Sequence, residues 1–147
     1  MSLPADDNAI DAAIAATRAL LDALEARRLD ECEALLAPDV EITVPGGSVV
    51  RSIRQLAANS TRRYTHVGKH YERFEGMRSA DGGITVYCIG TLHGRWLDGT
   101  PFDGIRYIDR FEFVDGKIRR QHVWNDTAYY QIAHGIAPPP PPPPGAA

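Results

Sequence analysis

IRYIDRFEFVDGKIRRQHVWN, residues 105–125, contains two alternating segments separated by the Asp-Gly pair at 115–116. In the first segment the odd positions are apolar except for Asp109, whereas the even positions carry most of the charge. Successive side chains of a strand point to opposite faces, so the odd positions of a strand over residues 102–114 are predicted to be buried. The Asp-Gly pair favours a tight turn into an antiparallel strand over residues 117–125.

The pattern changes on the N-terminal side of this hairpin. Glycine- and aspartate-rich turns separate the hairpin from earlier strands, and before them the apolar residues recur at helical spacing. Helices followed by strands indicate an α+β fold, with three N-terminal helices packed on one face of a curved antiparallel sheet. The expected helices span 8–28, 29–36 and 52–64, and the expected earlier strands span 39–44, 69–77 and 84–96.

Length and composition limit the classes of function. The 147 residues suffice for one hydrophobic core, which we place in a single domain over residues 6–134. A net charge of −3 without a basic stripe argues against nucleic acid as a partner. No long apolar run or signal-peptide pattern occurs, so neither secretion nor a membrane partner is expected. Cys32 and Cys88 lack a CxxC spacing, as is typical of reduced cysteines in the cytoplasm.

Residues 135–147 form a proline-rich tail. Its run of seven prolines at 138–144 cannot join a helix or a sheet ladder, and it favours an extended polyproline II segment that stays disordered. The alternative is a docking segment for a partner of the SH3 or WW type.

Asp109 is the strongest candidate for chemistry, because a carboxylate in an apolar row must find donors or stay protonated. A raised pKa would make it a hydrogen-bond donor to a developing oxyanion, and a moderately raised one would make it a general base. The alternative is a structural acid paired with a Tyr, His or Arg on a neighbouring strand. His66, where the third helix meets the sheet, is the expected proton partner of Asp109.

The remaining candidates would shape or polarise a pocket. Nucleotide-binding glycine motifs, nucleophile elbows and HExxH spacing are all missing, so no cofactor and no metal are expected. Alternation in the last strand leaves open which of its faces is buried, because a β-bulge would exchange them. The expected substrate-binding residues are Tyr64, His93, Tyr107, Trp124 and Asp126.

The amphipathic first helix, LDECEALLAPDVEITVPGG (29–47), the capped third helix and YIDRFEFVDGKIRRQHVWND (107–126) together resemble the SnoaL-like branch of the nuclear transport factor 2-like superfamily. The resemblance covers about residues 8–130. It implies a cone-shaped roll of the cystatin-like kind, with an internal pocket between helices and sheet, usually dimeric through the sheet. Ketosteroid isomerases, polyketide cyclases, scytalone dehydratase and non-enzymatic binders share this fold, so the fold alone implies no single reaction.

The catalytic residues of these relatives match this sequence only in part. In the ketosteroid isomerase pattern, the protonated Asp donor corresponds to Asp109, but the general base falls at Val44 and the tyrosine donor at about Leu20. In the scytalone dehydratase pattern, two pocket histidines fall near His66 and His93 and a helix carboxylate falls near Glu25. The epoxide hydrolase pattern keeps only its last carboxylate, at Asp126.

These observations lead to two hypotheses. The first is a cofactor-independent acid–base enzyme of the isomerase, dehydratase or cyclase type, acting on a small hydrophobic molecule with a carbonyl or hydroxyl group. The second is a non-catalytic protein of the same fold that binds a small molecule or serves as a dimeric scaffold. A homodimer is expected in either case, through apolar outer-face residues such as Ile108 and Val114.

Overall fold

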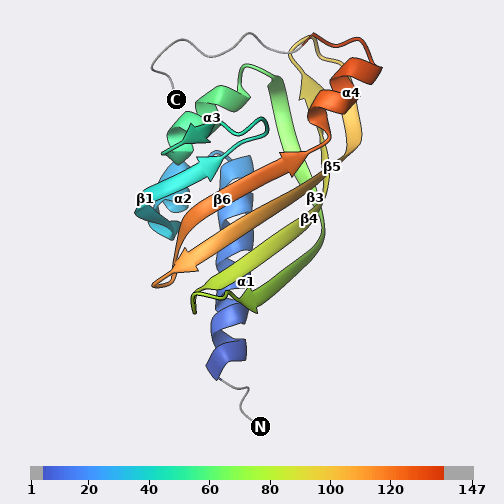
Figure 1. Cartoon of the computed structure of the whole chain (residues 1–147). Coiled ribbons are helices and arrows are strands. Elements are labelled where there is room, and N and C mark those ends of the chain that lie inside the picture. Colours follow the sequence, from blue (N-terminus) through green and yellow to red (C-terminus); the bar gives the residue numbers. More distant parts are fainter. Residues whose placement is uncertain (1–4, 138–147) are drawn as a thin grey trace.

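The computed structural model describes residues 5–137, and it confirms an α+β fold in which a curved, open sheet packs on the helices (Figure 1). The proline run at 138–144 lies outside the described residues. The elements are α1 (Ala5–Glu25), α2 (Leu29–Leu35), β1 (Leu36–Thr43), β2 (Val49–Val50), α3 (Ile53–Ser60), β3 (Tyr64–Arg78), β4 (Ile84–Trp96), β5 (Pro101–Val114), β6 (Lys117–Asn125) and α4 (Thr127–Ala133).

The sheet has six strands in the order β2-β1-β6-β5-β4-β3. Strands β3 to β6 form an antiparallel meander. The two edge strands of the whole sheet are β2 and β3. One pair departs from the antiparallel expectation, because β1 runs parallel to β6, with Ile42 opposite Gln121. Parallel neighbours require a long crossover, and here α3 and the first three strands of the meander supply it.

A β-bulge decides which face of β6 is buried. Phe113 pairs with Ile118, whereas Glu112 pairs with Arg120, so one extra residue of β6 interrupts the alternation. Ile118 and Gln121 are therefore both buried. Trp124, opposite Ile108, lies on the outer face with 49% of its surface exposed.

Helix α1 packs a small-residue and leucine face, including Thr17 and Leu20, against the inner face of the sheet. The helix ends in a Schellman motif, in which the Arg28 N–H donates to the Ala23 carbonyl at 2.8 Å and the Arg27 N–H donates to the Leu24 carbonyl at 3.1 Å. The left-handed residue of this motif is Arg27, with φ 59°, at a position where glycine is the usual choice.

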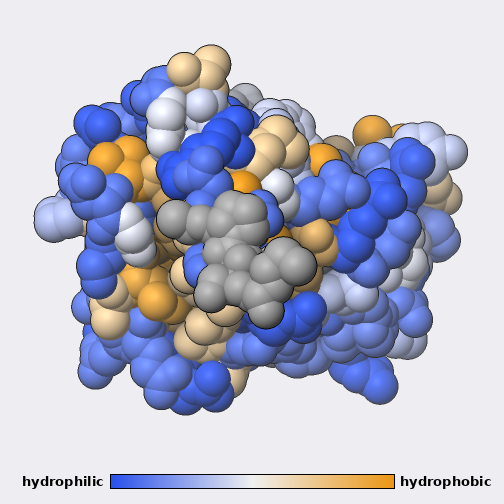
Figure 2. Space-filling view, turned by 90° about the horizontal axis from the view of Figure 1, so that it is seen from below, coloured by the Kyte–Doolittle hydropathy of each residue, from blue (hydrophilic) through white to orange (hydrophobic). Residues whose placement is uncertain are grey.

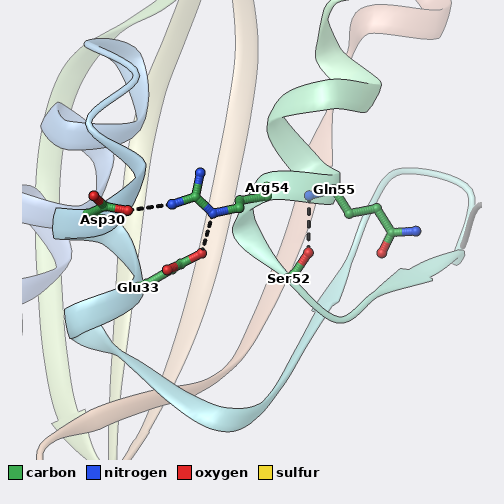
Figure 3. Close-up of polar contacts among 5 residues, drawn as sticks. All are labelled: Asp30, Glu33, Ser52, Arg54 and Gln55. Carbon is green, nitrogen blue, oxygen red and sulfur yellow. Dashed lines mark hydrogen bonds and ion pairs between the residues drawn. The ribbon is translucent and has the colours of Figure 1, made fainter.

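Helix α3 is capped and clamped at its N-terminal end (Figure 3). Ser52 caps it, accepting a hydrogen bond from the Gln55 N–H at 3.1 Å. Arg54 projects toward α2, where it forms ion pairs with Asp30 and with Glu33, the latter at 2.7 Å. These contacts fix α3 beside α2 and over the end of α1.

Helix α4 follows β6 and is absent from the sequence-based expectation. Its Thr127 and Gln131 are buried, while Tyr129 and Ile132 are largely exposed, so it presents no apolar stripe to recognise. The Tyr130 ring lies 6.1 Å from the Trp96 ring, which attaches α4 to the end of β4.

Candidate functional site

Asp109 is fully buried on the inner face of β5, as the alternation predicts. Its Oδ2 accepts a hydrogen bond from the Lys69 Nζ of β3, and the Lys69 side chain is 20% exposed. Its Oδ1 has no hydrogen-bond partner among residues 5–137. Burial raises the pKa of the Asp109 carboxyl, and the Lys69 ammonium only partly opposes that shift.

Tyr107 completes the surroundings of this ion pair. Its ring centroid lies 4.3 Å from the Lys69 Nζ, a distance at which a cation is attracted to the face of an aromatic ring. Its hydroxyl lies 3.2 Å from the Cys88 Sγ. Burial is the main cause that raises the pKa of both the Tyr107 phenol and the Cys88 thiol, so both groups stay neutral at physiological pH.

Lys69 reaches a pocket of about 90 Å³ between α1, α3 and β3. Asp109 is not part of the lining, so it lies behind Lys69 as seen from the pocket. Such a volume is well below the roughly 300 to 1,000 Å³ of ordinary ligand sites, and the deep pocket implied by the resemblance is correspondingly reduced. The wall is apolar at Leu21, Leu24, Leu56, Ala57 and Val67, and it is polar at Glu25, Arg27, Ser60 and Lys69.

Aromatic side chains occupy much of the inner space toward the end of β4. Tyr64 packs on Trp96 at 5.4 Å and on Phe102 at 5.5 Å between ring centroids. Tyr64 was expected to bind substrate, and it lies instead in this aromatic cluster, outside the pocket lining.

Glu25 and His93 meet at Gly68. A Cβ atom at residue 68 would lie 2.0 Å from the Glu25 Oε1 and 2.8 Å from the Cε1 and Nε2 of His93. Only glycine therefore fits between these two side chains without displacing them. Glu25 and Lys69 both line the pocket, and the Glu25 Oε1 and the His93 ring lie on the side of β3 toward which a Cβ atom at residue 68 would point.

His66 does not reach Asp109, whose hydrogen-bonded oxygen is taken by Lys69. The His66 ring is exposed and lies 6.0 Å from the ring of His93, which in turn stacks on His70 at 4.1 Å. His66 therefore lies beside His93, and both histidines are outside the lining of the pocket.

Trp124 and Asp126 lie apart from the pocket. Trp124 packs on His122 at 5.6 Å on the outer face of the sheet. Asp126 precedes α4 and accepts a hydrogen bond from the Arg106 Nε at 2.6 Å. Of the five expected substrate-binding residues, only Tyr107 contacts the Lys69–Asp109 pair and only His93 adjoins the pocket wall.

A second hollow, a wide groove of about 730 Å³, lies where α1 begins. The alanines of α1 face Phe113 and Val114 across it. Figure 2 views this end of the molecule, where apolar side chains show among a hydrophilic surround. The groove has no buried ionisable group in its lining, so it offers less chemistry than the smaller pocket.

Among residues 5–137, no three His, Cys, Asp or Glu side chains gather closely enough to hold a metal ion. Within the same part of the chain, no helix is both long enough and apolar enough to cross a membrane.

Comparison with known proteins gave a family and a fold. A family model described as a SnoaL-like domain matches residues 17–121. None of the curated proteins searched matches this chain.

Solved structures share the fold at low identity. An NTF2-like protein of unknown function from Burkholderia pseudomallei is 18% identical, with a TM-score of 0.68 over 82% of this chain and 95% of that one. A proposed polyketide cyclase from Pseudomonas putida is 20% identical, with a TM-score of 0.62 over 80% of this chain and 94% of that one. TerC, co-crystallised with polyporic acid, is 20% identical, with a TM-score of 0.67 over 82% of this chain and 96% of that one.

Proposed function

Because the chain belongs to the SnoaL-like domain family, we propose that it is a cofactor-independent acid–base enzyme acting on a small hydrophobic molecule that carries a carbonyl group. The observation that carries the proposal is that an acidic and a basic residue, Glu25 and Lys69, both line one largely apolar pocket. The named polyketide cyclase among the structural neighbours supports the same class of substrate.

Proton abstraction next to a carbonyl fits this pair of groups. Glu25 accepts the proton from the carbon beside the carbonyl, and the electron pair of the broken C–H bond forms the C=C bond of an enolate. Lys69 donates a hydrogen bond to the carbonyl oxygen, where the negative charge develops. Return of the proton from Glu25 to another carbon of a conjugated enolate completes an isomerisation, whereas transfer of that proton to a departing β-hydroxyl group, which leaves as water, completes a dehydration.

Asp109 acts in this proposal as a positioning residue rather than as the general base. Its carboxylate holds the Lys69 Nζ over the Tyr107 ring and balances its charge in a buried setting. In this proposal His66 is the proton partner of Glu25 and not of Asp109. When the proton on Glu25 is not returned to the substrate, it exchanges with solvent by way of His93 and the exposed His66 ring.

Exchange of carbon-bound protons tests the reaction without knowledge of the natural substrate. The protein is incubated in deuterated water with a panel of small cyclic ketones, and deuterium uptake beside the carbonyl is followed by NMR. The expected result is accelerated exchange of at least one ketone, slowed about 100-fold or more in Glu25→Gln because the base is lost. Lys69→Met should also slow exchange, because the developing oxyanion loses its donor.

Glu31→Gln is the matched control, since Glu31 lies on α2, is exposed and pairs with Arg28 outside the pocket. Exchange as fast in Glu25→Gln as in the unchanged protein would refute the proposed base.

The alternative function is non-catalytic binding of a small molecule. The small volume of the pocket favours it, as does Val44 at the position of the isomerase base. Binding of ketones without any accelerated exchange would support this alternative over the enzyme.

A further inference from the structure

Arg27 is a pocket residue that the proposed reaction does not use. It lies in the Schellman turn at the end of α1, where its side chain turns toward α3. Its Nη2 donates to the Ser60 Oγ at 2.8 Å and its Nη1 donates to the Leu24 carbonyl at 3.3 Å. Both Arg27 and Ser60 line the pocket, so they form one side of its rim.

The left-handed backbone conformation of Arg27 costs free energy of folding. A residue other than glycine in the left-handed region costs about 1 kcal/mol, and glycine is the common residue at this position of a helix end. With φ 59°, Arg27 carries that cost, whereas the glycines of several tight turns in this chain occupy the same region without it. Among the described residues, Asp115, with φ 51°, is the other non-glycine residue in this region, so Arg27 is one of two that carry the cost.

The charge of Arg27 is also unbalanced. Neighbouring Arg28 pairs with Glu31, and Arg54 pairs with Asp30 and Glu33. Arg27 forms no ion pair with any residue in the described range 5–137. A guanidinium has five N–H donors, and the two hydrogen bonds of Arg27 to neutral oxygens leave donors free.

The other charged groups of the pocket do not compete for the same position. The Lys69 ammonium is neutralised by Asp109 at the far side of the wall. The Glu25 carboxylate lies against Gly68 on the β3 side, whereas Arg27 reaches the α3 side. Apart from Glu25, Arg27, Ser60, Gly68 and Lys69, the wall is made of leucine, alanine and valine residues.

We infer that Arg27 is a specificity-determining residue that binds a carboxylate of the ligand at the rim of the pocket. The inference rests on the proposed function and narrows its substrate class to small oxo acids: an apolar body of ring size, a carbonyl directed to Lys69 and a carboxylate directed to Arg27. Arginine suits this role because its planar donors match the two oxygens of a carboxylate.

The test compares 3-oxocyclohexane-1-carboxylate with its neutral carboxamide. Dissociation constants are measured by NMR titration in the Glu25→Gln background, so that binding is observed without turnover. We expect the carboxylate to bind about tenfold more tightly than the amide, which is about 1.4 kcal/mol. That preference should weaken as salt is added, since exposed charges are screened.

Arg27→Gly is the informative variant, because glycine fits the left-handed backbone and should leave the melting temperature equal or higher. It should abolish the preference for the carboxylate and change the affinity for the amide less than twofold. Arg28→Ala, which removes an adjacent guanidinium outside the pocket lining, is the control and should keep the preference.

Equal affinities for the two probes, or a carboxylate preference that survives Arg27→Gly, would overturn the inference and leave the proposed proton transfer standing. A preference that depends on Arg27, in a protein that exchanges no ketone protons, would support the inference and refute the reaction. Failure of both probes to bind at millimolar concentration would overturn the inference together with the small-molecule pocket.

Discussion

Replacement of Lys69 by methionine is expected to destabilise the fold by about 3 to 5 kcal/mol at pH 7, because it leaves the Asp109 carboxylate buried without its cation. The Asp109 side chain is 0% exposed and that of Lys69 is 20% exposed, so water cannot take the place of the lost ammonium. The Asp109 Oδ1 already lacks a partner among the described residues, so no second donor is at hand.

The loss of stability in Lys69→Met should depend on pH. Burial raises the pKa of Asp109 above its ordinary 3.8, and removing the Lys69 ammonium raises it further. The folded state then binds more protons than the unfolded state above pH 3.8, so its stability falls as the pH rises toward the folded pKa. The slope is at most about 1.4 kcal/mol per pH unit. Most of the loss should therefore appear as the pH is raised from the ordinary pKa of the carboxyl toward neutrality.

Urea unfolding followed by circular dichroism at pH 4 and pH 7 measures both effects. Lys69→Met should lose far less stability at pH 4 than at pH 7. The double variant Lys69→Met, Asp109→Asn should recover most of the loss at pH 7, because the neutral amide needs no cation. Equal destabilisation of Lys69→Met at the two pH values, or a double variant as unstable as the single one at pH 7, would refute the buried ion pair.

The remaining predictions concern packing and assembly. Gly90→Ala should cost more stability than Gly68→Ala in urea unfolding, because a Cβ at 90 would lie 2.0 Å from the fixed backbone oxygen of His70, whereas a Cβ at 68 meets the movable end of Glu25 at 2.0 Å. Similar unfolding midpoints for the two variants would contradict this. The outer sheet face, which exposes 49% of Trp124, is expected to form a homodimer. Light scattering at micromolar concentration should show a dimer that Trp124→Glu converts to monomer, and a monomer in both proteins would count against it.

Two of the strands were predictable to within a residue, because Asp-Gly turns directly before them mark where they begin. The strand expected over 84–96 is β4, and the strand expected over 117–125 is β6. The two-residue strand β2 and the helix α4 were missed, since neither is long enough to show a period. The parallel pairing of β1 with β6 was missed as well, because a strand's own sequence does not specify its neighbour.

The candidate site likewise has features that the sequence predicts and features that it does not. Burial of Asp109 follows from a local pattern and was predictable. The pairing of Asp109 with Lys69 was not predictable, because that contact depends on how β3 and β4 align. A bulge after Tyr64 shifts the register of these two strands. Val67, Lys69 and Tyr71 do alternate on one side of β3, which in retrospect marks Lys69 as an inward-facing cation.

The pairing of β1 with β6 has a consequence for the order in which the chain can fold as it is synthesised. Without β6, the sheet order leaves β1 and β2 unconnected to β3, β4 and β5. Contacts between segments so distant in sequence form slowly, because the intervening chain must close first. One edge of β1 therefore stays unpaired until residues 117–125 leave the ribosome. During that interval the nascent chain depends on its helices, or on a chaperone, to keep this unpaired strand from other chains.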